Sequence, residues 1–185
     1  MKKSKIPEKI SFVMGSLPVI YSEDRIMYWN FYEAIVDTLR PDDVHEFMLV
    51  ETIANCDWEI IRYKRAKARI IDLRFQEALA NVLRPIIEEG TIIISRDKDA
   101  AQLAQDWFRD KETKKAIQDH LFDYGLDEEG VVAEAMRLCM NDLADLEQLV
   151  HSNERRRSLA YRDLQFWRET KPSRQALELK ALPSM

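Results

Sequence analysis

Aromatic and cationic side chains come together in the first half of the chain, and their types suit phosphate recognition. Trp58, Arg62 and Arg65 are spaced by four and three residues, which places them on one face of a helix. A guanidinium on this face can stack on the indole, and the cations continue through Arg69 in a basic stretch over residues 62–74. One hypothesis is a phosphate or nucleic-acid contact. The other is a basic helix face that pairs with acids on a neighbouring helix.

A second stretch, residues 155–168, mixes arginines with aromatic rings. Its members are Arg155, Arg156, Arg157, Tyr161, Arg162, Trp167 and Arg168. Rings that stack on bases and cations that follow the phosphates are typical of proteins that bind single strands. Arg157 and Trp167 also lie on the apolar line of the predicted helix, so part of this stretch should face a partner helix. The candidate interaction residues of both stretches are Trp58, Arg62, Arg65, Arg69, Arg156, Arg162 and Arg168.

Residue types that support catalysis are few and scattered. The 3 histidines do not form the paired Glu-x-x-His repeats that a di-metal carboxylate bundle needs. Neither Cys56 nor Cys139 has a histidine nearby in the sequence, and the 4 glycines contain no phosphate-binding loop. We therefore expect no catalytic residue, no metal and no cofactor, and interpret the chain as non-enzymatic.

The overall charge and cysteine usage restrict the setting of the protein. A net charge of -5 argues against a globally basic nucleic-acid binder, although a local patch can still bind. The 2 cysteines favour a reduced, cytoplasmic compartment over a disulfide scaffold. No apolar run approaches the length of a membrane span, so we expect no membrane partner.

Two long helical patterns must position these side chains. The first covers Leu126 to Lys171 without a proline. A line of residues there recurs at alternating spacings of four and three, which is a heptad pattern and predicts one long helix with a partner of similar length. The line reads Val132, Met136, Cys139, Leu143, Leu146, Val150, Asn153, Arg157, Ala160, Leu164 and Trp167. The predicted partner is the helix from Asp42 to Leu83, which stops before Pro85.

Charge predicts the direction of this pairing. Residues 44–60 are acidic and 61–74 basic, whereas 127–147 are acidic and 154–168 basic. Antiparallel pairing lays each acidic half on a basic half, and parallel pairing opposes like signs, so antiparallel pairing is favoured. The matching register brings Asp57 opposite Arg157, with Asn153 close by, as a polar contact that fixes register.

Shorter elements flank this pair. A helix should begin after Ser22 and end at Leu39, residues 86–95 should form an extended connection, and helices should cover residues 97–109 and 112–124. Residues 1–20 are interpreted as a flexible tail and residues 21–185 as one domain. The predicted fold is all-α: two long antiparallel helices form a coiled-coil-like hairpin, with shorter helices on its flanks.

Several segments together resemble a family of uncharacterised helical proteins of alphaproteobacteria. They are Ser22-Glu23-Asp24 with Tyr28 or Tyr32, Leu39-Arg40-Pro41, Trp58-Glu59 with Arg62 and Arg65, Gly125-Leu126, and Glu154, Arg156, Arg157, Arg162 and Arg168. The resemblance covers most of the chain after residue 20. It implies a bacterial cytosolic setting and no catalytic residues. The chain departs from the family pattern at Asn55 and Asp57, where an Asp and a Thr are usual.

Two functions fit these observations. The first is a non-enzymatic interaction or structural protein that binds a protein partner or a second copy of itself. Trp29, Trp58 and Trp107 lie beside the predicted seam, so we expect further cover for them, which self-association would supply. The alternative is a nucleic-acid-binding accessory protein that uses residues 62–74 and 155–168.

Overall fold

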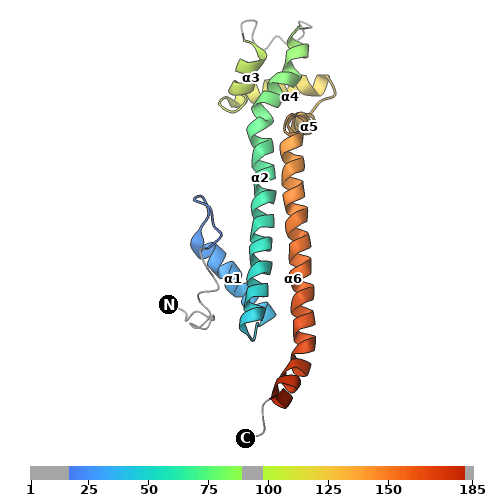
Figure 1. The fold of residues 1–185 in the computed structure, drawn as a ribbon. Helices are drawn as coiled ribbons and strands as arrows, with labels where there is room; N and C mark the ends of the chain where they lie inside the picture. Colours follow the sequence, from blue (N-terminus) through green and yellow to red (C-terminus); the bar gives the residue numbers. More distant parts are fainter. Residues whose placement is uncertain (1–16, 89–97, 182–185) are drawn as a thin grey trace. The chain divides into compact units, whose positions relative to one another are not determined.

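The computed structural model describes residues 17–88 and 98–181, and every regular element in these ranges is an α-helix. The helices in chain order are α1 (Arg25–Leu39), α2 (Val44–Glu88), α3 (Ala100–Asp106), α4 (Lys111–Asp123), α5 (Glu128–Leu138) and α6 (Met140–Ala181), as shown in Figure 1. The prediction of an all-helical chain is confirmed for these residues. None of these helices combines the length and the apolar character needed to cross a lipid bilayer.

The chain divides into two compact units, and each is built from both long helices. Unit 1 comprises Met1–Arg62 and Leu149–Met185, and unit 2 comprises Tyr63–Gln148. The boundaries fall inside α2 and α6, so the first part of α2 and the later part of α6 belong to unit 1. Each unit has its own buried cluster. The single domain expected over residues 21–185 stays a prediction.

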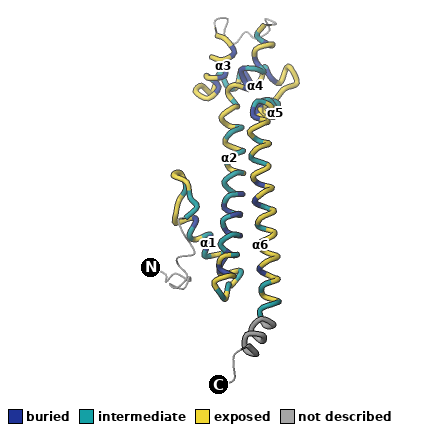
Figure 2. Tube along the Cα trace, in the orientation of Figure 1, coloured by how far each residue is buried: buried dark blue, intermediate teal, exposed yellow. Residues whose placement is uncertain are grey.

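The core of unit 1 is aromatic and is closed by three helices. Asp24, rather than Ser22, caps α1, because its side chain accepts hydrogen bonds from the Ile26 and Met27 amides. The buried cluster consists of Tyr28, Tyr32 and Val36 from α1, Phe47, Val50, Ile53, Ala54 and Trp58 from α2, and Ala160 and Leu164 from α6. Figure 2 colours the buried positions along the helices dark blue. Leu17 and Val19, from the segment expected to be a tail, pack against this cluster. Residues 1–16 lie outside the described ranges.

The core of unit 2 is aliphatic and gathers the short helices around the later part of α2. Its buried members include Ala78, Leu79, Leu83 and Ile86 from α2, Leu103 and Trp107 at α3, Ile117 and Leu121 from α4, and Val131 and Ala135 from α5. Helix α2 continues past its predicted end at Leu83 and contains Pro85. Burial of Ile86 in this cluster favours the extra turn over the break that proline usually causes. The rest of the predicted connection, residues 89–95, lies outside the described ranges.

The long helix predicted over residues 126–171 is interrupted, and this part of the prediction was wrong. Cys139 leaves the helical conformation, with φ −115° and ψ 21°, between α5 and α6. Its buried thiol donates to the Ala135 carbonyl. Helix α5 then turns Val131 and Ala135 into the unit 2 cluster, while the predicted seam residues Val132 and Met136 are 36% and 45% exposed. The heptad line holds only beyond the break.

Cover for the tryptophans comes from within each unit. Trp58 is 4% exposed in unit 1 and Trp107 is 5% exposed in unit 2. Trp58 contacts Tyr28 edge to face, with ring centroids 5.3 Å apart, and Trp107 packs against Phe75. Their need for cover therefore gives no support to self-association.

Candidate functional site

The densest group of charged side chains in unit 1 lies at the turn between α1 and α2. The turn begins at Arg40, whose φ of 47° is left-handed and whose amide bonds back to the Val36 carbonyl. A residue before proline avoids the right-handed helical conformation, so Pro41 explains why α1 ends here. The acidic residues around the start of α2 then face Arg168 and Lys171 of α6.

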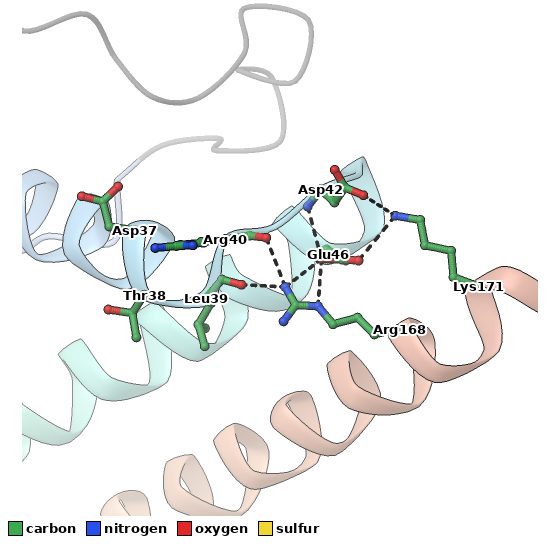
Figure 3. A pocket seen from close by; sticks show the side chains of 8 residues that line it. All are labelled: Asp37, Thr38, Leu39, Arg40, Asp42, Glu46, Arg168 and Lys171. Carbon is green, nitrogen blue, oxygen red and sulfur yellow. Dashed lines mark hydrogen bonds and ion pairs between the residues drawn. The ribbon is translucent and has the colours of Figure 1, made fainter.

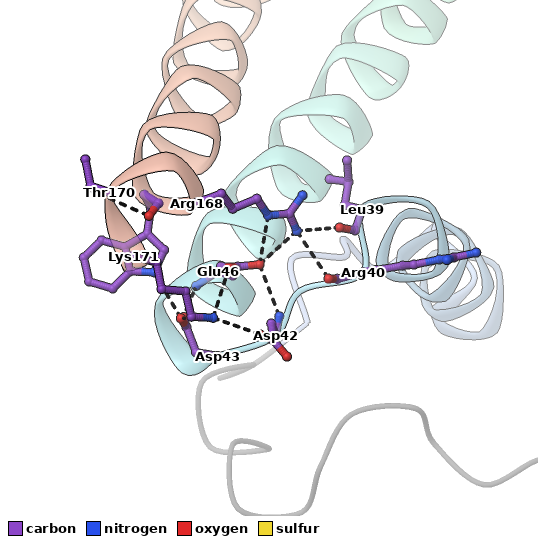
Figure 4. Close-up of polar contacts among 9 residues, drawn as sticks. Leu39, Arg40, Asp42, Asp43, Glu46, Arg168, Thr170 and Lys171 are labelled. Carbon is purple, nitrogen blue, oxygen red and sulfur yellow. Dashed lines mark hydrogen bonds and ion pairs between the residues drawn. The ribbon is translucent and has the colours of Figure 1, made fainter. Parts of the chain in front are cut away.

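Two cations from α6 meet three acids, of which Asp42 and Asp43 precede α2 and Glu46 lies in its first turn (Figure 4). Arg168 donates to Glu46 through Nε at 3.0 Å and through Nη2 at 2.8 Å. Lys171 Nζ lies 2.9 Å from Asp42, 3.1 Å from Asp43 and 3.6 Å from Glu46. We call these five residues the charge clasp. The clasp joins residues that are more than a hundred positions apart in the sequence.

The clasp also closes the end of α1. Arg168 Nη2 donates to the carbonyl oxygens of Leu39 at 2.6 Å and Arg40 at 3.3 Å. A cation is favoured at a helix C-terminus, because the last carbonyls are unpaired and carry the negative end of the helix dipole. One guanidinium, carried by α6, thus contacts both the end of α1 and Glu46 in the first turn of α2.

Burial and hydrogen bonding set the electrostatics of the clasp. Glu46 is only 2% exposed, and it is the buried charge that the two cations balance. Burial disfavours the charged form of Asp43, but hydrogen bonds from the Glu46 amide, the Trp167 indole and Lys171 outweigh it and lower the pKa of Asp43 to about 2. The hydrogen bonds to Asp42 and Asp43 raise the pKa of Lys171. Asp43 and Lys171 are therefore both charged at neutral pH.

A cavity of about 710 Å³ lies beside the clasp (Figure 3). Its lining consists of Asp37, Thr38, Leu39, Arg40, Asp42, Glu46, Arg168 and Lys171. The cations of the clasp already face acids, so the cavity presents a nearly balanced wall rather than a field of one sign. Among the described residues, no group of three or more His, Cys, Asp or Glu is placed to hold a metal ion. The charged groups that line the cavity also join α1, α2 and α6.

The polar seam expected from the sequence lies about three helical turns away from the clasp along α2 and α6. Arg157 Nη1 donates to Asp57 Oδ1 at 2.5 Å, so the structure brings these two residues together. The hydrogen bond to Asp57 raises the pKa of Arg157. Asn153 is buried but bonds within α6, to the Leu149 carbonyl and to Arg156. Asn55 accepts a hydrogen bond from the Tyr28 hydroxyl.

Trp58 and Arg62 are held by a residue that the sequence reading did not connect with them. Glu23 accepts from the Trp58 indole at 3.0 Å and from Arg62 Nε at 2.8 Å. The partners are 35 and 39 positions apart, and no periodicity links a loop residue to a helix at such distance. Arg62 thus pairs with an acid, as one hypothesis expected, but that acid is Glu23 in a loop and not a residue of the partner helix.

The remaining candidate residues differ in their surroundings. Arg65 and Arg162 are exposed, and Arg69 lies 3.8 Å from Asp72 in an exposed pair on the same helix. Arg156 bonds to Asn153, and Arg168 belongs to the clasp. The structure therefore divides the seven candidates among several local environments.

Unit 2 carries an apolar groove that the sequence analysis missed. Its lining consists of Lys67, Ala133, Met136, Arg137, Met140, Leu143, Ala144 and Glu147, and its volume is about 550 Å³. We call it the methionine groove. The heptad line contained Met136 and Leu143, but the reading placed them against a helix of the same chain. The groove spans the break at Cys139, with Met136 before it and Met140 after it.

Comparison with known proteins gives no relative from which a role could be transferred. No protein-family model, curated protein or solved structure matches the sequence.

Proposed function

We propose that the protein is a non-enzymatic helical interaction protein, and that the methionine groove of unit 2 is its contact surface. The observation that carries this proposal is the exposure of large apolar side chains there: Met136 is 45% and Met140 is 61% exposed. Exposed apolar surface that is continuous marks binding sites more often than chance. Methionine is common on such surfaces, because its flexible thioether adapts to different partners.

The rim of the groove supports a partner with both signs of charge. Lys67 pairs with Glu147 on one side, and Arg137 pairs with Glu134, at 2.6 Å, on the other. A rim with two cations and two anions matches a second copy, because a two-fold interface sets each patch against itself. We therefore propose self-association through this groove. The two free, buried cysteines, Cys56 and Cys139, fit action in the reducing cytoplasm.

We further propose that α2 and α6 pair as an antiparallel coiled-coil hairpin. Contacts within each unit support this, because the residue number of the α6 partner decreases as the residue number along α2 increases, as antiparallel helices require. In unit 1 these pairs are Glu46 with Arg168 and Asp57 with Arg157, and in unit 2 the pair is Lys67 with Glu147. Spin labels at the exposed positions Arg69 and Arg162 test continuity. A continuous hairpin gives one narrow distance distribution, and a broad one contradicts it.

The association test compares Met140→Glu with Met48→Glu. Met140 is the first residue of α6, where an acid is favoured, so the substitution should preserve the helix. Met48 is 51% exposed on α2 in unit 1 and serves as the matched control outside the groove. By light scattering from micromolar to submillimolar concentration, the unchanged protein and the Met48 variant should gain mass, and the Met140 variant should stay monomeric. A monomeric mass for the unchanged protein rejects self-association.

A partner other than a second copy is tested with the same two positions. A photoreactive amino acid at position 140 should crosslink to a protein in the native cell, and one at position 48 should not. Equal crosslinking at both positions would reject the groove as the contact surface.

A further inference from the structure

The carboxylate of Glu23 is bound more completely than a surface ion pair requires. It accepts four hydrogen bonds: from Arg62 Nε at 2.8 Å, from Arg62 Nη2 at 2.9 Å, from the Trp58 indole at 3.0 Å and from the Ile20 amide at 3.1 Å. The side chains of Arg62 and Glu23 are 19% and 12% exposed. Both carboxylate oxygens are thus hydrogen-bonded and largely shielded from solvent.

The three side-chain donors come from one rigid element. Trp58 and Arg62 are one turn apart on α2, and Trp58 is fixed by its contacts with Tyr28 and Phe31. The guanidinium presents Nε and Nη2 side by side, a fork that matches two oxygens of a carboxylate or a phosphate. The indole N–H adds a third donor from the same face. This arrangement has the chemistry of an oxyanion receptor.

The segment that carries Glu23 is attached mainly through this receptor. We call Leu17–Glu23 the strap. Arg62 also donates to the Pro18 carbonyl, while the backbone bonds from Val19 to Leu17 and from Glu23 to Ile20 stay within the strap. Leu17 and Val19 add apolar contacts, but Ile20 is 51% exposed and Tyr21 is fully exposed. Loss of the Glu23 contact would therefore release most of the polar attachment of the strap.

We propose that Trp58 and Arg62 form an oxyanion-binding site that the chain occupies with its own Glu23, and that the strap is a cover released when an external carboxylate or phosphate group takes its place. The tethered carboxylate has an effective concentration in the millimolar range or above, so an external anion must compete with it. This site lies in unit 1 and does not depend on the methionine groove.

The test uses the full chain with Glu23→Ala, which removes the internal carboxylate and leaves both donors. Inorganic phosphate and acetate are added separately at constant ionic strength set with chloride. The readout is the NMR signal of the Trp58 indole N–H, with the other three of the 4 tryptophans as internal references. The variant should show a saturable shift at concentrations at least about tenfold lower than the unchanged protein needs. Whichever anion binds tighter identifies the carboxylate or the phosphate class.

Two further variants separate the receptor from nonspecific effects. Glu23→Ala combined with Arg62→Ala should lose the response, because the fork is gone. Glu33→Ala is the matched control: Glu33 accepts from the Trp29 indole at 3.2 Å, a similar pair without an arginine fork. It should show no anion response at Trp29. No shift in the Glu23 variant, or an equal shift in the double variant, overturns the proposed site.

Release of the strap is measured on the unchanged protein, so it does not depend on the folding of a variant. Amide hydrogen exchange at Ile20 and Glu23 should accelerate as the tighter-binding anion is added, because both amides bond within the strap. Exchange in the α1 core around Tyr32 should stay constant. Unchanged exchange in the strap at saturating anion contradicts the cover.

Discussion

Unit 1 and unit 2 use polar side chains in different ways. In unit 1 the ion pairs connect distant parts of the chain and include buried or largely covered acids, such as Glu46 and Glu23. In unit 2 several pairs are local and exposed, such as Arg74 with Glu77 at i, i+3. Ion pairs join the helices around the core of unit 1. In unit 2 the core is packed mainly from aliphatic side chains, and an apolar groove lies on the surface. The buried ion pairs of Glu46 and Glu23 thus lie in unit 1, whereas the proposed contact surface, the methionine groove, lies in unit 2.

The strongest test of this contrast is Glu46→Gln. It leaves Arg168 and Lys171 without their buried partner, and we expect a loss of about 2–3 kcal/mol in the free energy of unfolding. The matched change Glu77→Gln breaks an exposed pair in unit 2 and should cost less than about 0.5 kcal/mol. Denaturant unfolding measures both variants. Equal losses would remove the distinction between the units.

A double-mutant cycle on Asp57 and Arg157 should give the next largest effect. These side chains are 23% and 34% exposed, so we expect a coupling energy of about 1 kcal/mol, attractive in sign. The same cycle on Arg74 and Glu77 should give a value near zero, within about 0.3 kcal/mol. A coupling for Asp57 and Arg157 that is no larger than this would show that their contact adds nothing to register.

Acid should weaken unit 1 through two carboxyl groups. Hydrogen bonds from Arg62 lower the pKa of Glu23 from 4.5 to about 2, and the pKa of Asp43 falls from 3.8 to about 2. A carboxyl with a lowered pKa stabilises the fold above its unfolded value and loses that contribution as pH falls through the folded value. The protection factors of the α1 amides, which compare observed exchange with the intrinsic rate at the same pH, should therefore fall between about pH 4.5 and pH 2.

The control for this pH dependence is Glu23→Gln, which should flatten part of the profile in unit 1. The protection factors of amides in the unit 2 core around Leu79 should change less over the same pH range. A profile for the variant that overlays the original would show that Glu23 does not contribute.

The smallest effect is expected from the exposed arginines. Replacing Arg65, Arg69 and Arg162 with alanine should change the free energy of unfolding by less than about 0.5 kcal/mol in each case. Retention on DNA or RNA columns at low salt should be weak and unaffected by the triple change. Strong retention that falls with salt, with a shallower slope in the triple variant, would instead favour the nucleic-acid alternative.

Regular repetition made part of the molecule predictable. The helical pattern and the opposed charge halves brought Asp57 to Arg157, because both depend only on spacing along rigid helices. The break at Cys139 was not predictable in this way, since Val132 and Met136 fit the heptad as well as Val131 and Ala135 fit the real core. What decides between them is packing of α5 on distant helices.

The candidate site shows the same limit. Glu46 and Arg168 lie in the predicted acidic and basic halves, whereas the other three residues of the charge clasp lie outside them. The hydrogen bonds from Arg168 to the last carbonyls of α1 depend on the left-handed turn at Arg40. The contact of Glu23 with Trp58 and Arg62 depends on the path of a loop. Such geometry follows from tertiary contacts and leaves no periodic signal.

The chain order of the charge clasp has a consequence for synthesis. Arg168 and Lys171 leave the ribosome last among the described clasp residues, yet they complete a turn at residues 39–46 that was made near the beginning. Unit 2 is one continuous segment, so its contacts can form while α6 is still growing. The clasp of unit 1, in contrast, cannot form until Arg168 and Lys171 have been synthesised.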